Sequence, residues 1–337
     1  HLEWRQDERY LGARIMNYGD LIRDAFRITL HNRFLWFFGF FAGGTGSNFI
    51  GNVPSGGGNF NFDDFRRSGA GVSGLTAQVG QGLSNMVLIL GIVVVVVLLA
   101  LFFIIMAIVS QGALADSVAA IDRGEGRRFG SAFGSGMGNF WRVLGYYVVF
   151  FLVALGLLVV IGVPVALLIG GTFAATESTG ARVSVAVIVG ILAVLLLIVV
   201  FIPLSIIGQY ALREIVVRRE RVVGSVGSGY SLFRRNIGRS LLLWLIQIGL
   251  SIGIGLAFIL LLLIVGLVLF IPTIALAVAG YSTVAIIAGV IAGLILLPIL
   301  LVATGAIGTF SHAYWTLAYL RVTAPPTPSP DPSPTPG

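Results

Sequence analysis

The sequence predicts an all-α integral membrane protein with six transmembrane helices, and three observations support this fold class. Of its 337 residues, 57% are hydrophobic and only 10% are charged, whereas soluble domains carry about 25% charged residues. The apolar residues gather in uncharged runs of about 20 residues or more, the length that a helix needs to cross the hydrocarbon of a bilayer. The arginines fall mainly in alternate connections between these runs.

Each apolar run is expected to be a helix, because an unpaired strand edge cannot be satisfied in lipid. The first run is diluted by glycine and is the weakest. The last run is too long for one straight crossing, so it must project beyond the bilayer, tilt, or break near Pro298 or Gly305. The six predicted spans are 32–50, 84–112, 142–169, 183–210, 241–271 and 284–319.

The arginines orient this predicted bundle. Of the 21 arginines, only Arg66, Arg67 and Arg182 lie outside the N-terminal segment, the second and fourth connections and the segment after the last span. Because positively charged connections stay in the cytoplasm, the distribution predicts an even number of spans with both chain ends cytoplasmic. It also supports the weak first span, since dropping that span would place the N-terminal arginines outside.

Three segments flank or interrupt the predicted membrane domain, which covers residues 16–322. Residues 1–15 precede Met16 and are expected to be a non-native or disordered extension. Residues 43–83 are rich in Gly, Asn and Ser and are predicted to form a flexible external loop. Residues 323–337 alternate proline with small residues and predict a disordered, polyproline-like tail in the cytoplasm.

A two-span unit is predicted to occur three times, which would make three parallel-repeat helical hairpins. Two return spans end in similar tetrapeptides, Gln111-Gly-Ala-Leu114 and Gln209-Tyr-Ala-Leu212, and residues 313–320 resemble them more loosely. Each unit begins with a segment that is predicted to be an amphipathic elbow helix at the cytoplasmic surface. In the second elbow, for example, Phe129 and Phe133 fall on one helical face.

Two sets of glycines are candidates for helix packing, because glycine lets helices approach closely. Gly130, Gly134 and Gly138 share one face of the second elbow, and Gly249 and Gly253 form a GxxxG pair in the fifth span. For the GxxxG pair two alternatives stand, packing within the chain and a dimer face.

Six arginines around the fourth and fifth spans are candidate contacts for anionic phospholipid headgroups. Each arginine near a membrane surface contributes about 1 kcal/mol of attraction. The alternative is that these arginines only set the topology, and Glu214 and Glu220 would partly offset binding. The six are Arg218, Arg219, Arg221, Arg234, Arg235 and Arg239.

The sequence lacks the residues of most catalytic and cofactor sites. It has no cysteine and no lysine, which excludes thiol catalysis, Schiff bases and lysine-dependent phosphate loops. His31 and His312 stand apart from clustered carboxylates, so no metal site is expected. Asp116, Asp122 and Glu125 lie beside arginines and are expected to be paired surface charges. We therefore expect no catalytic residue, no cofactor and no nucleic-acid partner.

Several short motifs resemble prokaryotic multi-span proteins related to the glycerophosphoryl diester phosphodiesterase membrane-domain family. They are Met16–Asp20 with Asn32–Gly39, then Asn139–Gly145 and Trp315–Tyr319, and the resemblance covers residues 16–322. It implies a multi-pass protein of the prokaryotic cytoplasmic (inner) membrane. Some family members also carry a phosphodiesterase barrel, but no position here matches its catalytic residues, and none is carried over.

These observations predict a non-enzymatic integral membrane protein that acts as a scaffold, a lipid-interacting protein or an accessory subunit. Its candidate partners are the bilayer, anionic phospholipid and another membrane protein. The alternative is a small-solute or lipid transporter, which the repeats and the in-span prolines favour. The absence of Asp, Glu and Arg inside the predicted spans argues against ion-coupled transport.

Overall fold

The computed structural model describes residues 17–45 and 82–324, and over these ranges the chain is helical with no strand. The predicted extension 1–15 and nearly all of the loop 43–83 and the tail 323–337 lie outside the described residues. The described helices are α2 (Tyr18–His31), α3 (Leu35–Thr45), α6 (Gly82–Asp122), α7 (Phe129–Gly138), α8 (Phe140–Ala175), α9 (Thr179–Val217), α10 (Val222–Arg235), α11 (Ile237–Val278) and α12 (Ser282–Thr323).

Five helices, α6, α8, α9, α11 and α12, are long and apolar enough to span a membrane, so this is an integral membrane protein. Each satisfies its backbone hydrogen bonds internally, which is why a helix tolerates hydrocarbon. At most 17% of the most apolar 18-residue window of any of them is buried within the chain. The surfaces of these helices are therefore available to lipid.

The first predicted span, 32–50, does not appear as a spanning helix in the described part of the chain. α3 has 11 residues and reaches about 16 Å, roughly half of the 30 Å hydrocarbon thickness. It is wedged against α6 and α12, with Leu35, Phe38 and Ala42 completely buried. These three apolar residues therefore pack against protein, and residues 46–50 of the predicted span lie outside the described residues.

The last predicted span does not break at Pro298 or at Gly305. α12 continues as one helix of 42 residues, about 63 Å long. Its excess length projects into the packed end of the bundle, where residues 312–319 are all buried. α6 and α9 also continue past their predicted ends, to Asp122 and Val217.

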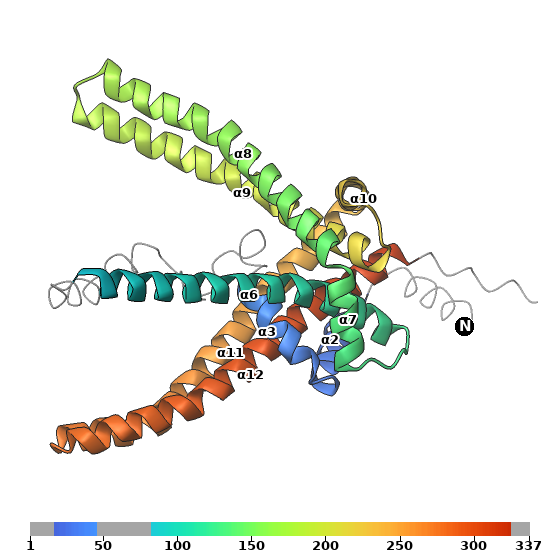
Figure 1. Cartoon of the computed structure of the whole chain (residues 1–337). Helices are drawn as coiled ribbons and strands as arrows, with labels where there is room; N and C mark the ends of the chain where they lie inside the picture. Colours follow the sequence, from blue (N-terminus) through green and yellow to red (C-terminus); the bar gives the residue numbers. More distant parts are fainter. Residues whose placement is uncertain (1–16, 46–81, 325–337) are drawn as a thin grey trace, which may run out of the picture.

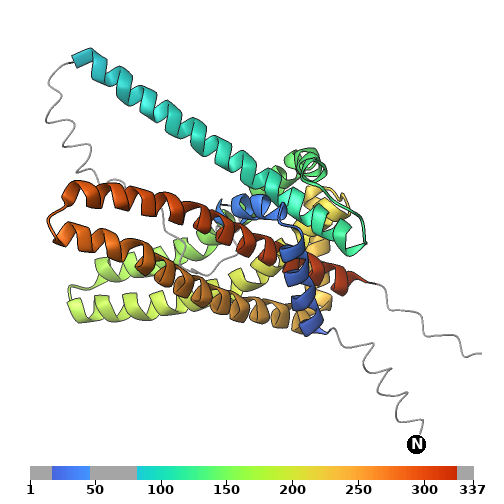
Figure 2. The same ribbon diagram turned by 90° about the horizontal axis from the view of Figure 1, so that it is seen from below.

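The long helices form three arms that diverge at one end of the molecule and converge at the other (Figures 1 and 2). α8 pairs with α9 and α11 with α12, and α6 makes the third arm. The hydrophobic core lies at the converging end, where residues of α2, α3 and α7 pack against the inner ends of the long helices. Towards the diverging ends large apolar side chains are exposed, for example Leu167 of α8 at 70% and Ile286 of α12 at 68%.

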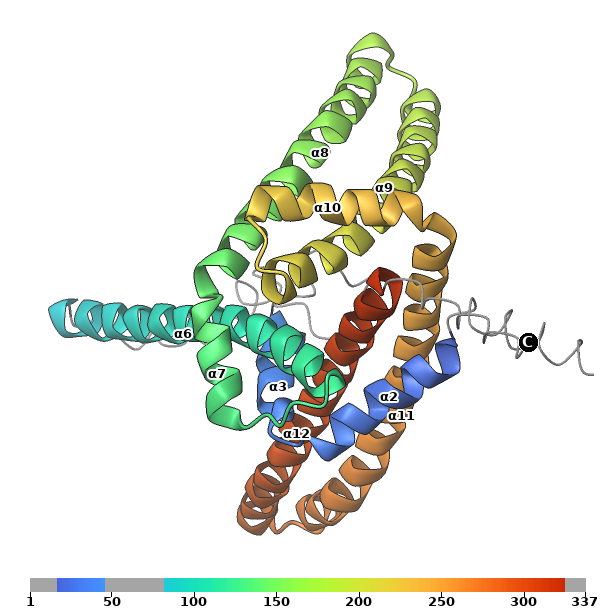
Figure 3. The same cartoon turned by 90° about the vertical axis from the view of Figure 1, so that its right-hand side faces the viewer.

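The short helices α2, α7 and α10 lie across the converging end, around the ends of α6, α9 and α12 (Figure 3). α7 packs on α6, α10 packs on α9, and α2 packs on α12. At the end of α12, Arg321 forms ion pairs with Asp24 of α2 (3.1 Å) and Asp122 of α6 (3.4 Å). The first and last described helices therefore meet at the same end of the molecule.

The three short helices end in the same local structure. Each has an asparagine as its C-cap, and the Nδ2 of that asparagine donates a hydrogen bond to the carbonyl oxygen four residues earlier. The donors are Asn32 (3.0 Å), Asn139 (2.9 Å) and Asn236 (3.2 Å). The sequence carries a signal for this shared feature that was not among the predictions. The signal is an asparagine followed within three residues by an arginine, just after each short helix.

Candidate functional site

A buried arginine lies in the packed end of the bundle. Arg213 belongs to α9, and its exposed fraction is 0%. Arg213 was predicted to lie in a cytoplasmic connection, because the predicted span ended at residue 210. The structure places it in a helix instead, since α9 continues for seven residues beyond 210 and the Arg213 side chain is buried. The side of the membrane on which it lies stays a prediction.

Only one nitrogen of the Arg213 guanidinium has hydrogen-bond partners. Nη1 donates to the backbone oxygen of Gln209 (2.9 Å) and to its Oε1. Nε and Nη2 have no partner, and no carboxylate pairs with Arg213, among the residues that the structure describes. Nε and Nη2 together form the edge with which a guanidinium holds a carboxylate or phosphate through two parallel bonds.

Two tyrosines near Arg213 direct their hydroxyl groups to other partners. Tyr146 donates to the Gly208 oxygen (3.0 Å), and the Tyr210 and Ser240 hydroxyls bond each other (3.0 Å). On α12, the His312 Nδ1 and Thr316 Oγ1 atoms are buried and have no partner in the described ranges. The packed end therefore holds several polar atoms whose hydrogen-bonding capacity is unused. Within residues 17–45 and 82–324, no group of His, Asp and Glu is arranged to hold a metal ion.

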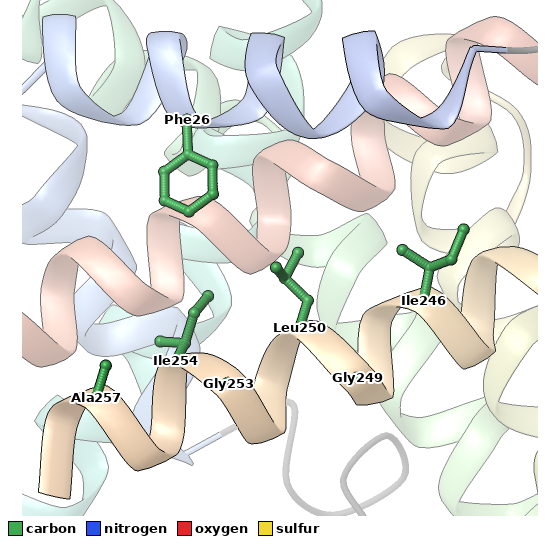
Figure 4. A pocket seen from close by; sticks show the side chains of 7 residues that line it. All are labelled: Phe26, Ile246, Gly249, Leu250, Gly253, Ile254 and Ala257. Atoms are coloured by element: carbon green, nitrogen blue, oxygen red, sulfur yellow. The ribbon is translucent and has the colours of Figure 1, made fainter.

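An open apolar groove of about 560 Å³ lies between α2 and α11 (Figure 4). Phe26 reaches into it from α2. The other lining residues all belong to α11, and they are Ile246, Gly249, Leu250, Gly253, Ile254 and Ala257. The two glycines create the depth of the groove, since each removes a side chain at successive turns of the same helical face.

The GxxxG pair was expected to pack helices, but neither glycine touches another helix of the described chain. A Cβ atom built on Gly249 or Gly253 would meet nothing within 4 Å. Packing within the chain, one of the two alternatives for this pair, therefore has no contact to support it here. The glycines open a surface towards the surroundings of α11.

The glycines predicted to pack the second elbow also face open space, because a Cβ on Gly130, Gly134 or Gly138 would meet nothing within 4 Å. The buried residues of α7 are Ala132 and Gly136, and Gly136 lies directly against the Val109 carbonyl of α6. Spacing in the sequence identified a glycine face, but the buried face of α7 is set by where α6 lies.

The six arginines proposed to contact anionic lipid are all exposed. They lie at the end of α9, in the α9–α10 connection, at the end of α10 and at the start of α11. Arg218 forms an ion pair with Glu214 (3.5 Å), and the other five have no ion pair with a described residue. Their contact with lipid stays a prediction.

The acidic residues near the end of α6 are paired, as predicted. Asp116 pairs with Arg127 (3.0 Å), and Glu125 pairs with Arg123 (2.7 Å). The hydrogen bond from Arg123 holds the pKa of the Glu125 carboxyl below its ordinary value. Asp122 pairs with Arg321 of α12, a partner that lies too far along the chain to be inferred from neighbouring residues.

A comparison with known protein families matches most of the chain to one family. A family model described as a family of unknown function (DUF7544) matches residues 32–326, so the chain belongs to that family. No curated protein and no solved structure matches the chain.

Proposed function

We propose that this member of DUF7544 is a non-enzymatic scaffold or accessory subunit of the prokaryotic cytoplasmic membrane that interacts with lipid. The observation that carries this proposal is the position of the core, which is confined to one end while three apolar arms diverge from it. A membrane domain that does not close on itself presents its helix flanks to lipid or to helices of a partner. Exposed apolar surface of this extent is typical of interaction sites.

In this proposal the chain crosses the membrane six times as three repeated hairpins, with both ends cytoplasmic. Two features support the repeat. Each short helix packs on the second long helix of the preceding unit, and α2 of the first unit packs on α12 of the last. Each short helix also ends in an asparagine cap. The ion pair between Arg321 and Asp24 supports the ends lying on one side. A sixth crossing requires the chain to continue outward beyond α3.

The resemblance to the glycerophosphoryl diester phosphodiesterase membrane-domain family supports only the architectural part of this proposal. It supports a membrane-embedded module that works beside another activity. It contributes no catalytic residue, because no position of this chain matches one.

Purification in mild detergent tests the proposed role. We expect the protein to retain either anionic phospholipid above its share of the membrane lipid, or a membrane protein in fixed stoichiometry, as measured by lipid and protein mass spectrometry. A variant with glutamine at Arg234, Arg235 and Arg239 is expected to retain less anionic lipid. Recovery of the wild-type chain with neither lipid nor protein would contradict the proposal.

A second candidate function, transport of an anionic solute or lipid, is favoured by Arg213. Arg213 is completely buried, and the Nε–Nη2 edge of its guanidinium, which suits a carboxylate or phosphate, has no partner among the described residues. Reconstituted vesicles would decide between the two functions. A transporter gives phosphate efflux or lipid exchange that Arg213→Gln abolishes, whereas a scaffold gives no flux above that of protein-free vesicles.

A further inference from the structure

We propose that the groove between α2 and α11 binds one acyl chain of an anionic phospholipid, whose phosphate lies against Arg239. The inference rests on the lipid-interacting role proposed above and assigns that role to a site. It commits to the occupant, its headgroup charge and the residues that hold each part.

The lining of the groove suits hydrocarbon. All seven lining residues are apolar or glycine, and no charged residue occurs in α11 from 240 to 278. In a membrane this part of α11 is surrounded by lipid tails, and an apolar cavity does not hold water. The groove is therefore filled by hydrocarbon from its surroundings.

The length of the groove suits one lipid chain. From Ile246 to Ala257 it follows α11 for about 16 Å, close to the thickness of one leaflet of a 30 Å hydrocarbon core. Volumes of roughly 300–1,000 Å³ are typical of small-molecule sites.

Arg239 lies where the headgroup of such a lipid would be. It precedes Ile246 by seven residues, which places the two side chains on nearly the same face of α11, about 10 Å apart along the axis. Its side chain leans towards the start of the helix, and Arg234 and Arg235 in the last turn of α10 lie just before that start. Arg239 is exposed and has no ion pair with any described residue, so its charge is available to a phosphate.

The test uses the full chain in phosphatidylcholine vesicles with a trace of phospholipid that carries a photoreactive group on its acyl chain. The probe is phosphatidylglycerol in one arm and phosphatidylcholine in the other, and crosslinks are mapped by mass spectrometry. We expect crosslinks to residues 246–257, stronger with phosphatidylglycerol. Adding inorganic phosphate distinguishes a lipid headgroup from free phosphate as the anion that Arg239 binds. If the groove holds the acyl chain and Arg239 holds the headgroup of the same lipid, phosphate should not displace the probe. If Arg239 binds free phosphate alone, the stronger crosslinking of phosphatidylglycerol should disappear.

Three variants separate the two parts of the site. Gly253→Leu fills the groove and should abolish the crosslinks of both probes. Arg239→Gln should keep the crosslinks but reduce the preference for phosphatidylglycerol about fivefold, which corresponds to about 1 kcal/mol for one arginine near the surface. Gly255→Leu is the matched control, since Gly255 lies at the same depth, does not line the groove and also has open space around its Cβ position.

Equal crosslinking in the Gly253→Leu and Gly255→Leu variants would overturn the groove as the site. An unchanged headgroup preference in Arg239→Gln would overturn the assignment of the phosphate. If the purified chain still retains excess anionic lipid, either result refutes this site and leaves the lipid-interacting role standing. If no lipid is retained at all, the proposed role itself fails. Equal thermal unfolding of the variants shows that they are folded.

Discussion

Arg213 shows how much a single residue decides in this protein. Its guanidinium is completely buried, and burying an ion costs several kcal/mol even after the protein relaxes. The two bonds from Nη1 to Gln209 recover part of that cost. A buried arginine of this kind either binds a ligand or lowers the stability of the fold. The transport function requires that Arg213 binds an anion, whereas the scaffold function gives it no ligand.

If the chain is a scaffold, replacing Arg213 by methionine should raise its stability. Methionine has a similar length and no charge, so it removes the cost of burying the guanidinium, which is roughly several kcal/mol for one ion. We expect a higher apparent melting temperature in detergent, measured by circular dichroism. A lower melting temperature, together with loss of bound anion, would instead favour the transport function. Arg218→Met is the control, because that side chain is 55% exposed.

Among the helices, α3 is held in place by its close contact with α12. Gly39 of α3 lies against the backbone of Gly305, and Gly308 lies against the Gly39 carbonyl. Thr309 adds a hydrogen bond to the Leu35 carbonyl oxygen (2.9 Å). Backbones approach this closely only where side chains are absent, so these glycines hold the short helix inside the bundle.

This contact predicts that Gly308→Ala destabilises the protein. The added methyl group overlaps the Gly39 backbone, and overpacking of this kind typically costs 1–3 kcal/mol. We expect a lower apparent melting temperature and faster proteolysis. Gly293→Ala on the same helix meets nothing within 4 Å and should be neutral or slightly stabilising, since alanine favours a helix over glycine by about 1 kcal/mol. Equal effects of the two substitutions would exclude close packing of α3 on α12.

The whole molecule combines a packed end with three open arms (Figure 1). The predicted orientation rests on the arginines, because those of α2, α10 and the connections beside them belong to segments at the packed end. The turn between α11 and α12 lies at the far end of its arm. The orientation therefore predicts that the packed end faces the cytoplasm and that this turn faces the opposite side.

Because the chain has no cysteine, single cysteines report topology directly. Ser282→Cys, at the outer end of α12, should react with a membrane-impermeant maleimide in intact cells. Ser231→Cys, on α10, should react only after the membrane is permeabilised. Six crossings further predict that Ser68→Cys behaves like Ser282→Cys. If Ser68→Cys behaves like Ser231→Cys, the first run does not cross and the six-span topology is wrong.

The sequence by itself determined the class of structure. Uncharged runs such as 84–112 must be helical in lipid, because only a helix forms all its backbone hydrogen bonds within a single segment. Five of the six predicted spans correspond to long helices. The acidic pairs near α6 were also predictable, since most partners lie within a few turns of each other.

Only the tertiary structure decided which surfaces face protein. α3 and α12 lie some 270 residues apart, and no local pattern distinguishes an apolar face that meets lipid from one that meets another helix. The same reason explains why Arg213 was assigned to a connection, why Gly136 rather than its neighbours packs α7, and why Gly249 and Gly253 line a groove. Hydropathy records whether a side chain avoids water, whereas contact between distant helices decides what surrounds it.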